Sequence, residues 1–308
     1  MSLKKMGLLA ILGIALVAGT LVFLRDHVIG TKEAAREITD LSSLYEATEE
    51  IEEAQKRLQD GVDPVEIVTK DAPPHVAIVI DGLPERTTTA RLLDVLKKHG
   101  ASAVFFVEGQ NAANQPETIK LIREAQQEIG NYTFVGVAAV EKLSEERRFS
   151  EICRTQRVVE VLTANKPRFF RAPRTQYDEE LLRTLRAAGL TYAVKESAHY
   201  APGWLKDEAG ARAYAATVPP GSILAIDVAV PVEPVAKAAV REEARPAVDK
   251  QPTVTDKPSE TPSKPPADAA DELDWLLTAL EETGKPPGRL DDFRKIHYIP
   301  AAATAPEK

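Results

Sequence analysis

Cysteine is nearly absent from this sequence, in which Cys153 is the only one among 308 residues. An intrachain disulfide framework is therefore excluded. We expect Cys153 to be a small buried residue of a helix, because folded proteins often bury free cysteine. Positive charge is also scarce, with 39 Lys and Arg against 47 Asp and Glu and a formal net charge of −8. This balance argues against a nucleic-acid partner, whose phosphates require a basic protein surface.

The N-terminal stretch at 6–24 contains no charged residue and reads MGLLAILGIALVAGTLVFL. At about 1.5 Å per residue, a helix of this length nearly spans the hydrocarbon core of a bilayer. Lys4 and Lys5 place residues 1–5 on the cytoplasmic side. We expect an uncleaved signal anchor, because the apolar run continues beyond the small residues at 17–19; a cleaved secretory signal is the alternative. In either case the rest of the chain is extracytoplasmic, at the cell surface or in a periplasm.

Residues 31–62 are rich in Glu, Ala, Lys and Gln and predict a helical stalk. A thin apolar stripe with two polar interruptions recurs there at spacings of three and four, formed by Leu41, Leu44, Thr48, Ile51, Gln55, Leu58 and Val62. The stripe either forms a short coiled coil, which would make the chain a homo-oligomer, or packs on the chain's own domain.

Residues 73–230 alternate between apolar β-branched runs and amphipathic segments. The runs predict strands at 76–80, 102–107, 132–137, 168–170, 191–194 and 223–228. The segments between them predict helices at 87–99, 116–129, 144–163, 178–188 and 206–215. Regular alternation of this kind predicts a parallel α/β sheet with right-handed crossovers. Periodicity alone does not separate an open sheet from a barrel.

Residues 231–267 contain eight prolines and no aromatic residue, and this composition predicts a disordered, extended insertion. The insertion is either a tolerated surface segment or an arm that reaches an envelope partner. Residues 268–300 are expected to complete the domain, with a helix at 270–283 and either a final strand or a docking peptide at 291–300. Residues 301–308 form a tail.

Three sequence segments between residues 73 and 230 resemble those of a known family. They are AVFFVEG at 103–109, EIGN at 128–131 and KPRFFRAP at 166–173. Together they resemble the polysaccharide deacetylases, whose members have a distorted (β/α) barrel. Members remove acetyl groups from chitin-like or peptidoglycan glycans with zinc or another divalent metal. The resemblance implies this barrel for the present chain, preceded by the transmembrane helix and the stalk.

Most of the residues that bind metal or act as the general base in that family are replaced in this sequence. In the family's Thr-Phe-Asp-Asp-Gly motif, one Asp is the general base and the next binds metal. Here Ile80 stands at the base position and Asp81 at the metal-binding one. The two metal-binding histidines of the family align with Tyr132 and Gly136. Isoleucine cannot accept a proton and glycine offers no ligand, so we expect no metal cofactor to bind.

The remaining motifs survive in part. Arg171 keeps the family's Arg-x-Pro motif, but the base that this arginine orients is replaced by Ile80, which leaves it a salt bridge or hydrogen bonds at the rim. The histidine that serves as the family's acid aligns with Ile226. We interpret these changes as converting a polar mouth into ordinary packing. Asp81 and Arg171 are then remnants.

A rebuilt site is the rival interpretation. Of the five histidines only His199, which follows a predicted strand, is placed to face Asp81, and an exposed loop histidine is the simpler reading. Glu196, Asp81 and Asp227 are expected at strand ends, where barrel sites lie. A pair of these carboxylates could perform acid/base chemistry, or they could be solvated rim charges.

The sequence therefore predicts a membrane-anchored, catalytically inactive homologue that binds a glycan or an envelope protein. Residues proposed to contact a sugar are Tyr132, Arg171, Tyr177, Tyr200 and Trp204. Two alternatives stay open. One is a divergent active deacetylase that uses Asp81, Glu196 and Asp227, and the other is an envelope scaffold that acts through the stalk and the Pro-rich arm.

Overall fold

The computed structural model describes residues 46–71, 74–228 and 268–298. The expected membrane span at 6–24, most of the stalk, the Pro-rich insertion at 231–267 and the tail at 301–308 lie outside the described residues. Within the described part of the chain, no helix is both long enough and apolar enough to cross a membrane. All the elements below lie in one unit, Thr48–Lys308.

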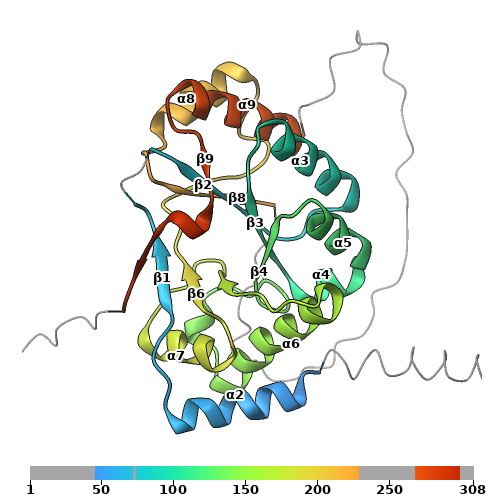
Figure 1. The fold of residues 1–308 in the computed structure, drawn as a ribbon, viewed down its shortest axis with the longest axis vertical. Helices are drawn as coiled ribbons and strands as arrows, with labels where there is room; N and C mark the ends of the chain where they lie inside the picture. The colour runs from blue at the N-terminus through green and yellow to red at the C-terminus, as the bar shows by residue number, and fades with distance from the viewer. Residues whose placement is uncertain (1–45, 72–73, 229–267, 299–308) are drawn as a thin grey trace, which may run out of the picture. The chain divides into compact units, whose positions relative to one another are not determined.

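One curled sheet organises this unit (Figure 1). Its strands follow the order β10-β1-β6-β5-β4-β3-β2-β8-β7, with β9 beside β2. Every pairing is parallel except that of β1 with β10. The path is open between β10 and β7, so the described strands form a curled half-barrel. The strands are β1 (Glu66–Thr69), β2 (Val76–Asp81), β3 (Ala103–Val107), β4 (Glu128–Asn131), β5 (Phe169–Phe170), β6 (Tyr192–Val194), β7 (Ala198–Tyr200), β8 (Ile223–Asp227), β9 (Pro287–Gly288) and β10 (Arg294–Ile296).

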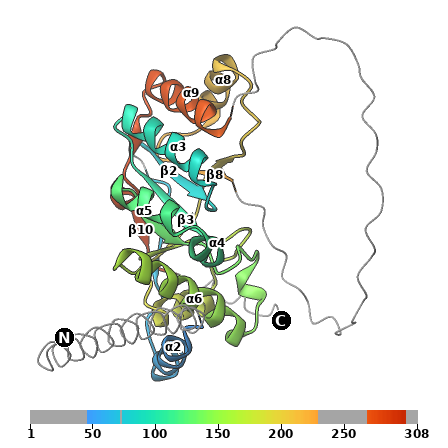
Figure 2. The same cartoon turned by 90° about the vertical axis from the view of Figure 1, so that its right-hand side faces the viewer.

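The helices form an arc around the outside of this sheet (Figures 1 and 2). Side-chain caps begin several of them, as where Ser144 accepts the Arg147 N–H and Asp178 accepts the Leu181 N–H. The helices are α2 (Thr48–Asp60), α3 (Arg86–Lys98), α4 (Gly109–Asn114), α5 (Pro116–Glu124), α6 (Glu145–Thr163), α7 (Glu179–Ala187), α8 (Glu208–Thr217) and α9 (Ala269–Glu282), with short 3₁₀ turns at Val140–Lys142 and Leu290–Asp292.

The face of the sheet away from these helices, here called the inner face, carries its own apolar cluster. Strand residues of this cluster alternate with residues that face the helices, as the period of two requires. The C-terminal Leu290 and Phe293 close over it. The cluster consists of Val68, Ala77, Val79, Val104, Phe106, Tyr132, Phe169, Val194, Ile223, Ala225, Leu290 and Phe293.

The described end of the predicted stalk is α2, and it packs on its own domain. Ala54 is fully buried, and Arg57 donates from Nε to the carbonyl of Ala187 in α7 at 2.7 Å. On the other side, Glu50 pairs with Arg157 of α6 at 3.3 Å. This part of the helix therefore packs on the domain through Ala54. Of the predicted stripe, Ile51, Gln55 and Leu58 are half-buried and Thr48 is exposed. Cys153 of α6 is buried, as expected.

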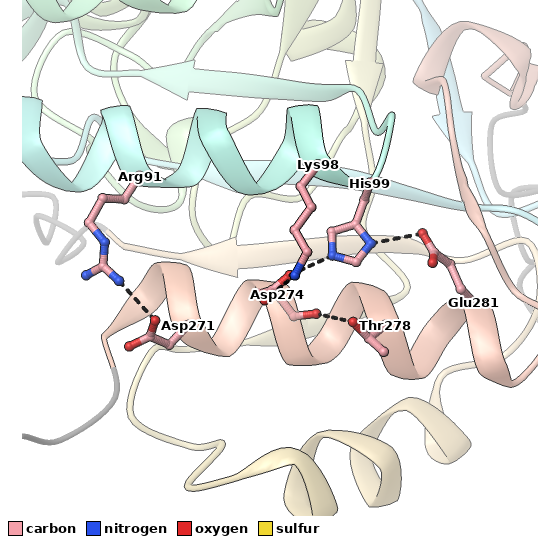
Figure 3. A network of polar contacts seen from close by, with 7 residues as sticks. All are labelled: Arg91, Lys98, His99, Asp271, Asp274, Thr278 and Glu281. Carbon is pink, nitrogen blue, oxygen red and sulfur yellow. Dashed lines mark hydrogen bonds and ion pairs between the residues drawn. The ribbon is translucent and has the colours of Figure 1, made fainter. Parts of the chain in front are cut away.

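Helix α9 is fixed to α3 by a polar network (Figure 3). Asp274 accepts from Lys98 at 2.7 and 2.8 Å and contacts His99 Nε2 at 2.7 Å. The other nitrogen of the His99 ring lies 3.1 Å from Glu281. Arg91 pairs with Asp271 at 2.9 Å. Beneath this polar layer, Leu273, Leu276, Leu277 and Leu280 are fully buried.

Two predicted elements are wrong in their bounds. Helix α5 ends at Glu124 rather than 129, because Gln126 has φ +57° and the Gln127 N–H returns to the Ile122 carbonyl. The strand expected at 132–137 is a loop, since Thr133 (φ +65°) and Gly136 (φ +72°) adopt left-handed backbone that a strand excludes. The neighbouring strand is instead β4. At the C-terminus, β10 realises the strand alternative for 291–300, and β1, α4, β7 and β9 were not anticipated.

Candidate functional site

At the C-terminal edge of the sheet, the apolar residues of the inner face are followed by polar side chains. Each lies two residues after an inner-face apolar residue, so the strand period of two places it on the same side. Asp81 follows Val79 in this way, Glu108 follows Phe106, and Arg171 follows Phe169. Glu196 follows Val194 and Asp227 follows Ala225. Because parallel strands end at one edge, these groups converge on a single mouth, the edge where barrel sites are found.

Arg171 and Asp81 form the centre of this mouth. The Arg171 Nε donates to both carboxylate oxygens of Asp81, at 2.8 and 2.7 Å. Its Nη1 donates to Glu196, whose side chain is 40% exposed, whereas Arg171 and Asp81 are buried. Arg171 therefore forms a salt bridge, which is one of the two roles expected from the sequence, and its partners are two carboxylates. The expectation that the mouth is ordinary packing is therefore wrong, because a charged network occupies it.

Burial and charge act in opposite directions on these groups. Burial raises the pKa of Asp81 to about 7, with the charges of Asp227 and Glu196 adding to the effect and Arg171 opposing it. Burial alone would also raise the pKa of Glu196, but Arg171 outweighs burial and lowers it. Arg171 itself stays protonated, because Asp81 and Glu196 overcome its burial and raise its pKa. The mouth thus holds a fixed guanidinium between two carboxylates.

Ile80 and Ile226 face away from the mouth. They lie beside each other on β2 and β8, as Asp81 lies beside Asp227 one residue later. Both isoleucines are fully buried, and the alternation that points Asp81 inward points them toward the helices. The two apolar replacements therefore pack together in the helix-facing layer.

The loop that carries Tyr132 and Gly136 is held by hydrogen bonds. Asn131 accepts the Thr133 N–H at 2.9 Å, and Thr133 accepts the Val137 N–H at 2.9 Å. At Gly136 an added Cβ would lie 3.3 Å from Glu108 Cγ, and Glu108 in turn accepts the Leu83 N–H at 2.9 Å. The loop is therefore built around a glycine in left-handed backbone.

These residues do not fit a divalent metal. Tyr132 is buried and its pKa is raised by burial and by the charge of Asp81, which keeps the phenol neutral and a poor ligand. Gly136 has no donor, and both Asp81 oxygens already accept from Arg171. Across the described ranges, no three His, Cys, Asp or Glu side chains are grouped as a metal site.

The four aromatic residues expected to contact sugar differ in exposure. Tyr132 and Tyr200 are buried, and the Tyr200 hydroxyl has no hydrogen-bond partner. Tyr177 is half-buried and donates its hydroxyl proton to the Val194 carbonyl at 3.0 Å. Trp204 is 55% exposed. Since a stacking ring needs an open face, Trp204 is the member of this set that presents one.

His199 forms no hydrogen bond or ion pair with Asp81, whose two oxygens accept from Arg171. It is exposed on β7, beside Ala225 of β8, and its ring meets that of Trp204 edge to face at a centroid distance of 5.7 Å. His199 and Trp204 therefore extend the rim of the mouth on the side of β7 and β8.

Two polar residues of this region were missed from the sequence. Glu108 could have been found by the step of two from the inner-face Phe106. Glu272 of α9 is buried and accepts backbone N–H groups at Gly203 and Leu205, on either side of Trp204. The residues that donate to Glu272 lie almost 70 positions away in the chain, so no local sequence pattern predicts this contact.

Two hollows lie at the opposite, N-terminal ends of the strands. One of about 320 Å³ lies beside Gln127, Glu128 and Pro167, and one of about 340 Å³ beside His75 and Phe293. In the first hollow Arg168 donates to Glu128 and also to Asp291. The charged network of Asp81, Arg171 and Glu196 lies at the mouth rather than beside these two hollows.

The sequence of this chain is similar to those of known deacetylases. Residues 69–193 match the family model described as polysaccharide deacetylase. Over 99 residues the chain is 32% identical to a peptidoglycan-N-acetylglucosamine deacetylase of Bacillus cereus, which covers 32% of this chain and 36% of that protein. It is 32% identical over 106 residues to the chitin deacetylase of Colletotrichum lindemuthianum, covering 33% of this chain and 42% of that protein. The matches thus span less than half of these curated relatives.

Solved structures share the fold. A CE4 family pseudoenzyme from Bacillus anthracis superposes with a TM-score of 0.52 at 19% identity, covering 77% of this chain and 70% of that chain. A mutant of a CE4 family pseudoenzyme with restored enzymatic activity gives a TM-score of 0.53 at 20% identity, covering 77% and 73%. The family 4 carbohydrate esterase PdaA of Bacillus subtilis gives 0.54 at 19% identity, covering 83% and 88%.

Proposed function

Because the chain carries a polysaccharide deacetylase domain over residues 69–193, we propose that it is a membrane-anchored, extracytoplasmic pseudoenzyme that binds a glycan without hydrolysing it. The anchor is the apolar segment at 6–24. The glycan binds at the rim of the mouth, over Trp204 and the exposed edge of Glu196. The chemistry proposed for this chain is recognition alone.

The observation that carries the proposal is the pairing of Asp81 with Arg171. A metal-dependent deacetylase needs several protein ligands around one cation and a base for its water. Here the carboxylate aligned with a metal ligand has both oxygens bound to a buried guanidinium. Its neighbours supply a neutral phenol at Tyr132 and no donor at Gly136. In this arrangement Arg171 provides the positive charge that Asp81 requires.

The binding half of the proposal is supported by the rim. Sugar rings have apolar faces that stack on exposed aromatic rings and hydroxyls that bond to charged groups. Trp204 offers such a ring, and 40% of the Glu196 side chain is exposed at the mouth.

A divergent hydrolase is a second candidate, favoured by Asp81. With its pKa raised to about 7 by burial, this carboxyl can gain and lose a proton near neutral pH, as a general base must. Its engagement by Arg171 weighs against that role.

The test uses the full chain in detergent, with the Bacillus cereus deacetylase as an active control. We expect substoichiometric zinc, cobalt and nickel by elemental analysis and no acetate release from the N-acetylglucosamine tetramer. We expect calorimetry to detect binding of that tetramer. Stoichiometric metal together with acetate release would overturn the pseudoenzyme proposal in favour of the hydrolase. Absence of any glycan binding would overturn the binding half.

A further inference from the structure

Trp204 is presented by an ordered turn rather than a loose loop. Its N–H donates to the Ala201 carbonyl at 3.2 Å, and Gly203 before it has φ +97°. Leu205 after it is buried, which fixes the turn from below. Among the described residues, Val161 is the other large hydrophobic side chain with comparable exposure, and it is not aromatic.

Both backbone donors that flank Trp204 bind one carboxylate. Glu272 Oε1 accepts the Gly203 N–H at 2.6 Å, and Oε2 accepts the Leu205 N–H at 3.1 Å. Glu272 is only 1% exposed. A buried carboxylate is costly unless it is hydrogen-bonded, and charge-assisted bonds are about twice as strong as neutral ones. The carboxylate therefore holds the turn at two points.

Glu272 itself is on a rigid element. Helix α9 begins with a capping box in which Asp268 and Asp271 satisfy each other's backbone N–H groups. The network with α3 holds one face of the helix, through Asp274 to Lys98 and His99 (Figure 3). The anchoring of α9 is thus transmitted to the turn that carries Trp204.

We infer that Glu272 is a positioning residue that holds Trp204 in place as a stacking platform for the sugar ring of a glycan. The inference rests on the proposed function and adds a specific recognition element to it. A ring ordered before binding loses less conformational entropy when it stacks, so the platform gains affinity from its support. The His199 ring packs edge to face against Trp204, with 5.7 Å between the ring centroids, and so restricts the motion of the Trp204 ring on that side.

The test exploits the two tryptophans of the chain, Trp204 and Trp275. In a full-length Trp275→Phe background, Trp204 is the single fluorescent reporter. Time-resolved anisotropy then measures its local motion, and calorimetry measures binding of the N-acetylglucosamine tetramer. The variants are Glu272→Gln, which keeps one acceptor oxygen and places an amino group against the second N–H, and Glu282→Gln as a control on the exposed face of α9.

We expect Glu272→Gln to increase the fast-motion amplitude of Trp204 and to weaken tetramer binding about tenfold, with Glu282→Gln matching the parent in both. If Glu272→Gln does not fold, Glu272→Asp keeps the charge with a shorter reach and should show the same changes. Unchanged Trp204 motion in a folded Glu272 variant would overturn the inference. So would tetramer binding that Trp204→Ala leaves intact.

The proposed function fails in a different way. If the parent binds no tetramer while Glu272→Gln still mobilises Trp204, the positioning of Trp204 is supported and the glycan as its ligand is overturned. Capture of a protein through Trp204 in that case would identify a protein interface instead.

Discussion

Arg171 and Asp81 are 90 residues apart in the chain, yet the arginine Nε donates to both oxygens of the aspartate at the mouth of the half-barrel. The partners come from β2 and from the residue after β5, with β3 and β4 between them in the sheet. The pair therefore spans the inner face rather than joining neighbouring strands. It links the two sides of the mouth.

Removing Arg171 leaves a buried carboxylate without its cation. We expect Arg171→Met to lower the free energy of unfolding by about 3 kcal/mol at neutral pH, measured by urea denaturation. Since burial raises the pKa of Asp81 to about 7, the loss should be largest above pH 7 and should shrink as the pH falls through that value. Arg212→Met, which removes an exposed pair with Glu282, is the control and should change stability by less than about 1 kcal/mol. Equal effects of the two variants would contradict a special role for the buried pair.

Restoring an acid at the family's base position should fail. Ile80 is fully buried and faces the helices, so Ile80→Asp places a carboxylate in an apolar layer. We expect a loss of several kcal/mol in urea denaturation and no acetate release. Ile80→Val should cost only about 1 kcal/mol. A stable Ile80→Asp protein would show that position 80 can turn toward the mouth.

The glycine at the second metal-ligand position is required by the backbone. Gly136→Ala adds a Cβ at φ +72° and 3.3 Å from Glu108, and we expect it to destabilise the domain by about 1–2 kcal/mol. Gly189→Ala, at φ +89° with no atom within 4 Å of the added Cβ, isolates the backbone cost and should be milder. Thermal unfolding of the two variants gives the comparison, and a larger loss for Gly189→Ala would contradict the crowding at Glu108.

The contact of α9 with α3 should weaken in acid. Burial would raise the pKa of Asp274, but hydrogen bonds from Lys98 and His99 outweigh it and lower the pKa. A lowered folded pKa contributes stability above the ordinary pKa of 3.8, and this contribution is lost as pH falls through the folded value.

Asp274→Asn should therefore be less stable than the parent by roughly 0.5–1 kcal/mol at pH 6. The difference should diminish below pH 4. Urea denaturation at several pH values provides the measurement. A difference that is constant from pH 6 to pH 3 would exclude the ionised form as its source.

Most of the fold was predictable because its signals are local. The apolar run at Val76–Asp81 and the capped helix at Glu145–Thr163 carry their periodicity in the sequence itself. The loop after β4 was not predictable. Thr133 adopts left-handed backbone there, which its β-branched side chain disfavours, because hydrogen bonds within the folded domain impose this conformation. The sequence of 132–137 alone still reads as a strand.

The positions of the site residues were predictable from the sequence, whereas their hydrogen-bond partners were not. The step of two along each strand places Asp81, Glu196 and Asp227 at one edge. That Arg171 turns to Asp81, and that Glu272 supports Trp204, depends on contacts between distant segments. Ile80 was identified as a lost base, whereas the direction of its side chain follows from strand geometry that a motif comparison does not include.

The antiparallel pairing of β1 with β10 has a mechanical consequence. Ile67 lies beside Ile296 and Thr69 beside Arg294, so the chain enters β1 at the end where it leaves β10. A pull on the C-terminus of a chain tethered at its N-terminus would load these hydrogen bonds one after another, as in a zipper, rather than all together in shear. Peeling β10 away in this manner would uncover Phe293, which is 2% exposed in the folded domain, and with it the inner face.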